Sequence, residues 1–242
     1  MHGYTKPAAS RIALATYSLA PELVEDDRLL LEPLARRGIC AEPVVWDAPD
    51  VDWAAYDAVI IRSCWDYYLR RDEFLDWVAR LEATGTPLWN PPAVVRWNSD
   101  KSYLRELESD GVLIVPTRWV APEEAATLAE LLEETGWDEV VVKPVVSAGA
   151  HETWRTSRAR AADDEPRFRA LASRQRLMIQ PFLPEITTAG EYSLFFFGGE
   201  FSHAVVKRPC PGDFRVQLQY GGQAIAVEPD DALFFAAWAA LR

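Results

Sequence analysis

Residues 138–155 read DEVVVKPVVSAGAHETWR, in which apolar runs rich in valine flank a polar loop. Runs of β-branched residues are typical of strands. Lys143 closes the VVV run, and the small loop residues Ser147, Ala148 and Gly149 let the backbone move or approach a ligand closely. The segment therefore predicts a strand that ends in a lysine beside a mobile loop.

The residues before this segment alternate between strand and helix patterns. Leucine spacing predicts a helix that ends at Gly38, a normal C-terminal signal. The expected elements are strands at residues 11–17, 41–47, 57–67 and 87–90 and helices at residues 25–37 and 72–83. This order indicates an open, largely parallel sheet with covering helices, in a lobe that ends at about residue 97.

The rest of the chain predicts helices mixed with antiparallel strands. A helix that carries Lys101 is expected to open at Asn98 or Ser99 and to stop at Gly111. Alternating apolar residues toward the end of the chain indicate antiparallel strands joined by tight turns. The other expected elements are a strand at 113–120, a helix at 122–136, a solvated helix with loops at 155–176, and strands at 177–186, 191–208 and 214–227. The fold class is therefore α+β, with an α/β lobe at the N-terminal side.

Composition narrows the range of functions. The net charge of -12 over 242 residues argues against nucleic acid and anionic membranes, since both require clustered positive charge. Three widely spaced cysteines fit neither a disulfide framework nor a cysteine-rich zinc site, and no run approaches the roughly 18 apolar residues of a spanning helix. We expect a cytoplasmic protein with small-molecule partners and no nucleic-acid or membrane partner; a homo-oligomer is left open.

Lysine is scarce, because arginine fills almost every basic position. The 25 basic residues include only the lysines Lys6, Lys101, Lys143 and Lys207. Lys143 and Lys207 close predicted strands, where side chains point into clefts above a sheet. Compact ammonium groups suit the α- and β-phosphates of a nucleotide, and a loop of small residues can fold its N–H groups over the last phosphate. Coding bias is the alternative explanation of why lysine is so scarce relative to arginine.

Seven ordered blocks together resemble the ATP-grasp ligases of the glutathione synthetase and RimK type, and within them the group around the cyclo-ligase of cycloserine biosynthesis. The blocks are NSDKSYL (98–104), VVVKPVVSAGAHET (140–153), MIQPFLPEI (178–186), GEYSLFFFGG (190–199), SHAVVKRP (202–209), DFRVQ (213–217) and GG (221–222). No single block is specific to this family, but the order and spacing of the blocks together are. The resemblance implies an N-terminal lobe on the substrate side (1–97), a first ATP-grasp subdomain with a flexible loop at 147–153 (98–177), and a second subdomain that is incomplete at its C-terminal end (178–242).

The resemblance also implies roles for individual residues around ATP. Lys101 and Lys143 would hold the α- and β-phosphates, with Ser147, Ala148 and Gly149 as the lid over the γ-phosphate. The remaining roles are backbone contacts to adenine from Gln180, Phe182 and Leu183, ribose binding by Glu191, a clamp on the γ-phosphate and acyl-phosphate by Lys207 and Arg215, and a tight turn beside the substrate at Gly221 and Gly222. The alternative for Glu191 is an edge-strand charge that keeps the strand soluble.

The N-terminal lobe contributes a candidate substrate site. RSCWDYY follows the end of a predicted strand, where α/β sheets usually place ligands, so Arg62, Trp65 and Asp66 are candidates for binding the acyl substrate. Packing is the alternative for Trp65. Cys64 has no convincing base partner and is not expected to be a nucleophile.

Two features depart from the family pattern. Relatives continue with an acidic strand and a Glu-x-Asn element that hold magnesium, so the expected metal ligands lie beyond Arg242 and none within this chain. Ser193 stands where many relatives carry arginine. The resemblance as a whole nevertheless implies an ATP- and Mg²⁺-dependent carboxylate-amine ligase that works through an acyl-phosphate. The alternatives are a silent nucleotide-binding module that lacks the magnesium-binding end, and a non-catalytic α/β scaffold protein.

Overall fold

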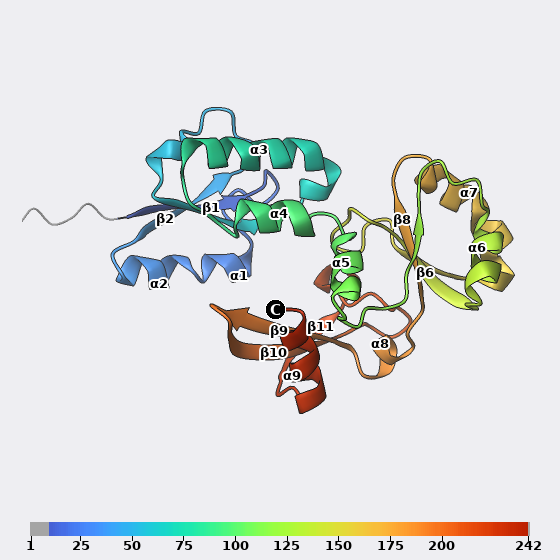
Figure 1. Ribbon diagram of the computed structural model, residues 1–242. Helices are drawn as coiled ribbons and strands as arrows, with labels where there is room; N and C mark the ends of the chain where they lie inside the picture. The colour runs from blue at the N-terminus through green and yellow to red at the C-terminus, as the bar shows by residue number, and fades with distance from the viewer. Residues whose placement is uncertain (1–9, 242) are drawn as a thin grey trace, which may run out of the picture. The chain divides into compact units, whose positions relative to one another are not determined.

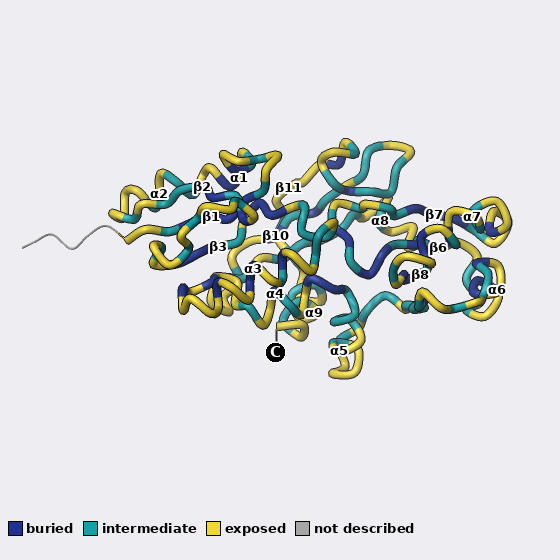
Figure 2. Tube along the Cα trace, turned by 90° about the horizontal axis from the view of Figure 1, so that it is seen from above, coloured by how far each residue is buried: buried dark blue, intermediate teal, exposed yellow. Residues whose placement is uncertain are grey.

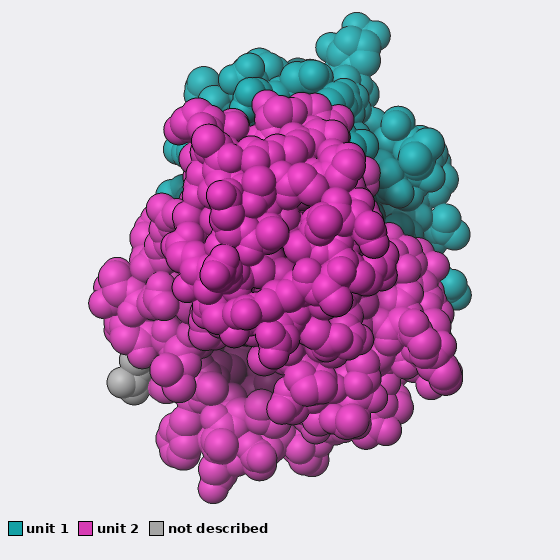
Figure 3. Space-filling model, turned by 90° about the vertical axis from the view of Figure 1, so that its right-hand side faces the viewer, with its two compact units in different colours: residues 1–100 teal, residues 101–242 magenta. Residues whose placement is uncertain are grey.

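The computed structural model describes residues 10–241, and the chain divides into two units, Met1–Asp100 and Lys101–Arg242 (Figure 3). Each unit has its own sheet structure and its own hydrophobic core. Most of the largest buried residues lie in strands and helices. Figure 2 shows where buried residues lie along the chain.

The first unit contains one parallel sheet. Its strands are β1 (Arg11–Thr16), β2 (Cys40–Val45), β3 (Ala58–Ser63) and β4 (Leu88–Trp89), in the order β2-β1-β3-β4. Ala13, Leu14 and Ala15 of the central strand β1 are fully buried, because helices lie on both faces of the sheet. The predicted open parallel sheet is confirmed.

Helices cover this sheet on two sides (Figures 1 and 2). The helices α1 (Glu25–Arg28) and α2 (Leu31–Arg36) lie over one face, and α3 (Arg71–Thr84) lies over the other, packed against α4 (Pro92–Asn98). The prediction of one continuous helix over residues 25–37 is therefore wrong. Pro33 lies in the first turn of α2, where proline is tolerated, whereas in a longer helix its ring would clash with the carbonyl of Leu29.

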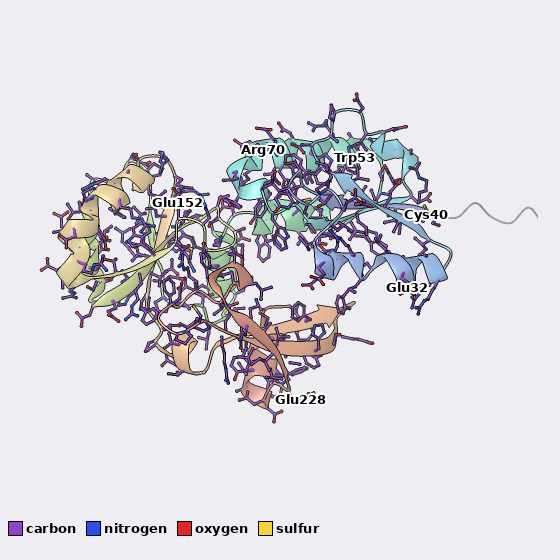
Figure 4. All side chains as sticks on the ribbon, turned by 180° about the vertical axis from the view of Figure 1, so that it is seen from behind. Glu32, Cys40, Trp53, Arg70, Glu152 and Glu228 are labelled. Carbon is purple, nitrogen blue, oxygen red and sulfur yellow. The ribbon has the colours of Figure 1, made fainter. Side chains whose placement is uncertain are left out.

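Aromatic residues form much of the core on the α3 side. Trp46 packs edge-on against Phe74, with ring centroids 5.4 Å apart, and Trp53 packs against Trp77 at the same distance. Arg70 places its guanidinium 4.8 Å from the centre of the Trp46 ring. Arg70 and Trp53 lie on this side of the sheet, whereas Glu32 lies on the α2 side (Figure 4).

The second unit contains two antiparallel sheets. The first consists of β5 (Arg118–Val120), β8 (Leu177–Pro181), β6 (Glu139–Pro144) and β7 (Trp154–Ser157), in that order. The helices α6 (Leu128–Thr135) and α7 (Ala161–Ala172) pack together against it and share one core with its strands. This arrangement leaves the opposite side of β6 and β8 available for a site.

The second sheet has the order β11-β10-β9. Its strands are β9 (Glu191–Phe197), β10 (Glu200–Arg208) and β11 (Gln223–Val227), with α8 (Glu185–Thr188) before them and α9 (Asp231–Ala239) after them. The turn between β9 and β10 uses Gly198 and Gly199, both with positive φ. The α+β fold class is confirmed.

Several predicted boundaries in this unit are wrong. Asn98 ends α4 and α5 (Tyr103–Ser109) begins later, so Lys101 lies in a turn between two helices. The helix expected from residue 122 begins at Leu128, because the Thr127 side chain accepts a hydrogen bond from the Glu130 N–H in a reciprocal capping box. The other corrections are strand β5, which covers only 118–120 of the run 113–120, and the run 214–227, of which only 223–227 is strand.

Candidate active site

A cavity of about 330 Å³ in the second unit is lined by residues from both antiparallel sheets and from the segments that connect them. This volume lies at the lower end of the range typical of small-molecule sites. The lining residues that the sequence had indicated are Lys101, Lys143, Ser147, Gly149, Gln180, Phe182, Leu183, Glu191 and Arg215. Ala148 and Lys207 were also indicated but do not line the cavity.

Lys143 brings an ammonium group into the cavity from the end of β6. Burial lowers the pKa of Lys143, because a low-dielectric environment disfavours the charged form, and the Glu191 carboxylate acts in the opposite direction. An anion bound beside this ammonium would stabilise its charged form further. Lys143 is therefore suited to hold a phosphate.

Lys101 joins the turn before α5 to the loop after β6. Its backbone N–H donates to the Val145 carbonyl at 3.0 Å, and its Nζ donates to the Ser147 carbonyl. These bonds place two lysines that are far apart in the chain at the same cavity. Such a pair of cations offers the local positive charge that an anionic ligand needs in an acidic protein.

The loop of small residues forms one wall of the cavity. Gly149 and Ala150 have positive φ, and the Ser147 hydroxyl donates to the His151 carbonyl at 2.9 Å. Gln219 donates its Nε2 to the Gly149 carbonyl at 3.1 Å, which fastens the loop to a distant segment. Gly149 has a φ of 58°, which favours glycine, whereas the Gln219 Nε2 atom 2.9 Å from an added Cβ could move aside.

Several polar groups at and after the end of β8 already form hydrogen bonds within the protein. The Phe182 N–H donates to the Glu139 carbonyl at 2.9 Å, so it cannot bind adenine unless that bond breaks. The Leu183 carbonyl accepts from the Ile186 N–H at 3.1 Å. Gln180 donates its side-chain amide to the Thr117 hydroxyl at 2.8 Å. The expected backbone contacts to adenine are thus restricted to the other backbone groups of this segment.

Apolar side chains complete the cavity, and the sequence reasoning missed them. The Phe182 and Phe214 rings meet edge-on with centroids 6.0 Å apart. Apolar walls with a few polar groups are typical of sites for a flat aromatic ligand. The missed apolar residues are Val115, Val141, Ala150, Pro181, Ile186, Phe214 and Val216. The block DFRVQ contained a signal for two of them, since Phe214 and Val216 flank the indicated Arg215.

Both residues expected to clamp the γ-phosphate are paired with acids. Lys207 Nζ lies 3.2 Å from Glu191 Oε1, and Arg215 binds Asp213 through Nε at 3.0 Å and Nη2 at 2.7 Å. The Arg215 hydrogen bonds lower the pKa of Asp213 to about 2. Arg215 also lies 3.7 Å from the centre of the Tyr220 ring. Arg215 is therefore held in place at the cavity wall before any ligand binds.

The two glycines of the GG block do not line the cavity but shape the segment that does. A Cβ at Gly222 would lie 1.9 Å from the Val216 carbonyl oxygen, closer than any real contact. Only glycine fits there without a shift of the backbone. Gly221 has a φ of 79°, which a side chain would strain.

The candidate residues of the first unit separate into two groups. Arg62 and Trp65 line a smaller cavity of about 220 Å³ within that unit. Asp66 does not line it; its carboxylate accepts from Trp46 Nε1 at 2.9 Å and pairs with Arg70 at 2.6 Å. The Asp66 carboxylate thus binds one residue of the aromatic core, Trp46, and the partly exposed Arg70 that lies over the Trp46 ring. Burial raises the pKa of the Cys64 thiol, which keeps it protonated and unsuited to nucleophilic attack.

Residues 10–241 contain no group of three or more histidine, cysteine, aspartate or glutamate side chains placed to hold a metal ion. Within the same residues, no helix combines the length and the apolar character that crossing a membrane requires.

The fold is of the mixed α/β class, with a parallel sheet followed by two antiparallel sheets, and comparison with known proteins identifies its family. Residues 12–90 match the model of the N-terminal domain of D-cycloserine synthetase DcsG, and residues 111–232 match that of the prokaryotic glutathione synthetase ATP-grasp domain. The chain belongs to the ATP-grasp family of ligases.

Individual relatives support this assignment. The chain is 34% identical over 200 residues to the cycloserine biosynthesis protein DcsG of Streptomyces lavendulae, covering 81% of this chain and 67% of the relative. The crystal structure of D-cycloserine synthetase DcsG superposes with a TM-score of 0.84 and 31% identity, over 96% of this chain and 80% of that one. Glutathione synthetase of Parasynechococcus marenigrum is 32% identical over 154 residues, which cover 61% of this chain and 46% of the relative.

Proposed function

We propose that this chain binds ATP in the 330 Å³ cavity and works as a carboxylate-amine ligase, or a ligase of a closely related kind. The observation that carries the proposal is the shared lining of one cavity by Lys101, Lys143, Glu191 and Arg215, next to the Phe182 and Phe214 rings. Cations suit phosphates, and flat apolar walls suit a purine.

The lining residues divide between the two ends of a nucleotide. Val141, Phe182 and Phe214 would enclose the adenine, and Glu191 would accept hydrogen bonds from the ribose hydroxyls. Lys101 and Lys143 would hold the α- and β-phosphates. The Ser147 to Gly149 loop would cover the γ-phosphate with its N–H groups, as backbone turns of this kind bind anions.

Bound ATP would transfer its γ-phosphoryl group to a substrate carboxylate and leave as ADP, and an amine or similar nucleophile would then attack the acyl-phosphate and release inorganic phosphate. Arg215 has the planar guanidinium that suits the developing negative charge, and Asp213 fixes its orientation. Lys207 reaches the phosphates only if its bond to Glu191 exchanges for a phosphate contact. Preorganised charge of this kind is the main protein contribution to phosphoryl transfer.

Mg²⁺ at a nucleotide is usually held by one or two carboxylates together with the substrate phosphates. Among residues 10–241, no three or more histidine, cysteine, aspartate or glutamate side chains are grouped so that they could hold a metal ion by themselves. No metal ion is therefore placed on these residues alone.

A second candidate function is nucleotide binding without chemistry. The pairing of Arg215 with Asp213 and of Lys207 with Glu191 favours it, since both cations already have acidic partners. A non-catalytic scaffold is the third candidate.

Two measurements separate the three functions. Calorimetric titration with ATP, with and without Mg²⁺, should show saturable binding; no binding in either condition would leave only the scaffold. Phosphate release in the presence of ATP, Mg²⁺ and a panel of carboxylates and amines should then exceed the rate with ATP alone. Tight ATP binding with no carboxylate-dependent release would identify a silent binder.

A further inference from the structure

A groove of about 1010 Å³ lies beside the edge strand β7 in the second unit. It is larger than the cavity of about 330 Å³ proposed for ATP, and the proposed function does not use it. Its walls are β7, α7 with the turn before it, α8, and the segment at 209–215 that follows β10. We call it the arginine groove, because four of its lining residues are Arg155, Arg160, Arg167 and Arg215.

The arginine groove follows the free edge of a sheet. β7 is the last strand in the order β5-β8-β6-β7, and within residues 10–241 it pairs with β6 alone. All five residues at 153–157 line the groove, although successive side chains of a strand point to opposite faces of its sheet. The Trp154 side chain is buried in the core, and the Thr156 hydroxyl bonds to Asp164 of α7. The groove therefore meets the backbone edge of β7, where N–H and C=O groups have no neighbouring strand.

The charge of the groove is opposite to that of the chain. Its four arginines are accompanied by only two acids, Glu139 and Asp213, whereas the whole chain carries 37 acidic and 25 basic residues. A local excess of positive charge in an acidic protein concentrates anions at that place. The groove is therefore suited to a ligand with negative charge.

Two of the arginines are available to such a ligand. Among residues 10–241, Arg167 has no acidic partner within ion-pair distance, and its guanidinium lies 4.1 Å from the centre of the Trp154 ring. Arg160 is 66% exposed and approaches Asp164 only to 3.9 Å. A guanidinium offers several N–H donors in a rigid plane that matches a carboxylate.

Edge strands often carry charged residues that prevent pairing with other chains, which is the alternative explanation of the arginines. Arg155 fits that explanation, because it lies on β7 and pairs with Glu139 at 2.6 Å. Arg160 and Arg167 do not fit it, since they come from α7 and the turn before it and not from the strand. Their position beside the edge is that expected of groups that bind a ligand placed along it.

We propose that the arginine groove binds an extended acidic peptide, which adds a strand to the free edge of β7. Backbone hydrogen bonds to β7 hold the peptide, and Arg160 and Arg167 select carboxylate side chains on it. A small polyanion would use the arginines but not the strand edge, so the combination of both favours a peptide. The inference goes beyond the proposed function and does not depend on ATP binding.

The test uses the full chain and a synthetic hexapeptide of alternating glutamate and valine with both ends blocked. The same peptide with glutamine in place of glutamate is the uncharged counterpart, and tripolyphosphate is the small-anion probe. Calorimetric titration should show saturable binding of the glutamate peptide and an affinity about tenfold or more lower for the glutamine peptide. Bound glutamate peptide should also slow hydrogen exchange at alternate amides of β7, those that face the groove, while amides bonded to β6 change less.

Variants locate the effect. Arg160→Gln combined with Arg167→Gln should weaken binding of the glutamate peptide by about tenfold or more, to nearly the affinity of the glutamine peptide. The matched control removes two exposed charges at the end of α2, with Arg36→Gln and Arg37→Gln, and should change nothing. Arg160→Gln alone, at a largely exposed residue, provides the same test with a smaller loss if the double variant does not fold.

Four results would overturn the inference. They are no saturable binding of the glutamate peptide, equal affinities for the two peptides, unchanged affinity in the folded double variant, and binding without protection of β7 amides. Binding of tripolyphosphate that the double variant weakens, without peptide binding, would assign the groove to a small anion instead. Failure of the proposed function is seen separately in the ATP titration, which the double variant should leave unchanged.

Discussion

Lys207 Nζ and Glu191 Oε1 lie 3.2 Å apart across the neighbouring strands β10 and β9, where the two residues are register partners. Glu191 lines the nucleotide cavity and Lys207 does not. The pair therefore connects a group proposed for the ribose with a group proposed for the phosphates. Both side chains are about one-third or more exposed, so the pair itself adds little stability.

Glu191 should discriminate between ribose and deoxyribose. If its carboxylate accepts from the ribose hydroxyls, the chain binds ATP more tightly than 2′,3′-dideoxy-ATP by about 1.5–3 kcal/mol, the range for a hydrogen bond to a charged group. Glu191→Gln should reduce that difference. Calorimetric titration of both nucleotides against both proteins checks this prediction. If Glu191→Gln prefers ATP over 2′,3′-dideoxy-ATP as strongly as the unmodified chain does, Glu191 serves only to keep the strand edge soluble.

Lys143→Arg should weaken ATP binding by about tenfold or more, which corresponds to about 1.4 kcal/mol. The charge is kept, but the ammonium of Lys143 is desolvated at the end of a strand, and the larger guanidinium plane cannot take its position. The control is Lys6→Arg, the same change at a lysine outside the described residues. Equal ATP affinities of Lys143→Arg and the control would contradict the assignment.

Gly222→Ala should be more damaging than Gly198→Ala. At Gly198 nothing lies within 4 Å of an added Cβ, so only the positive φ is strained, at a cost of about 1 kcal/mol. At Gly222 the Cβ would meet the Val216 carbonyl at 1.9 Å, so the segment that carries Arg215 must move. We expect Gly222→Ala to lose about 2 kcal/mol or more in urea unfolding, together with ATP affinity, whereas Gly198→Ala keeps normal ATP affinity.

Asp213 should contribute stability that disappears in acid. Its pKa in the folded chain is about 2, below the ordinary 3.8, because Arg215 favours the carboxylate. The contribution is therefore fully present above about pH 3.8 and is lost as the pH falls through about 2. We expect Asp213→Asn to cost about 1 kcal/mol at neutral pH, allowing for solvent screening, and the difference from the unmodified chain to shrink over that acidic window. A difference that stays constant with pH would exclude this origin.

Gln219→Ala should release the loop at residues 147–153. The only side-chain bond from Gln219 among the described contacts goes to the Gly149 carbonyl, so its loss frees the loop without touching Lys101 or Lys143. Hydrogen exchange of the loop amides should become faster, while exchange in β6 stays unchanged. Gln223→Ala is the matched control, because that glutamine is exposed on β11 and lies outside the loop. Faster exchange in both variants would point to a general loosening.

Local sequence patterns predicted much of the fold. The valine run before Lys143, the parallel strands of the first unit and the helix stops at Gly38, Gly85 and Gly136 follow from residue preferences within a few positions of chain. The order of the blocks also led to the ATP-grasp family, which the comparisons confirm. The helix starts were less predictable, since Thr127 determines one of them through a capping bond and Pro33 divides another helix.

The sequence alone determined which elements form and which residue types are available for a nucleotide, because strand and helix preferences and the scarcity of lysine are properties of the chain itself. Tertiary structure decided which of those groups meet. Lys101, Lys143, Glu191 and Arg215 reach one cavity only because two sheets pack around it, whereas Lys207 turns to Glu191 and Asp66 to Trp46 and Arg70. Contacts between distant residues depend on the packing of whole elements and on which partner each polar group finds when it leaves water, and neither is encoded in a short stretch of sequence.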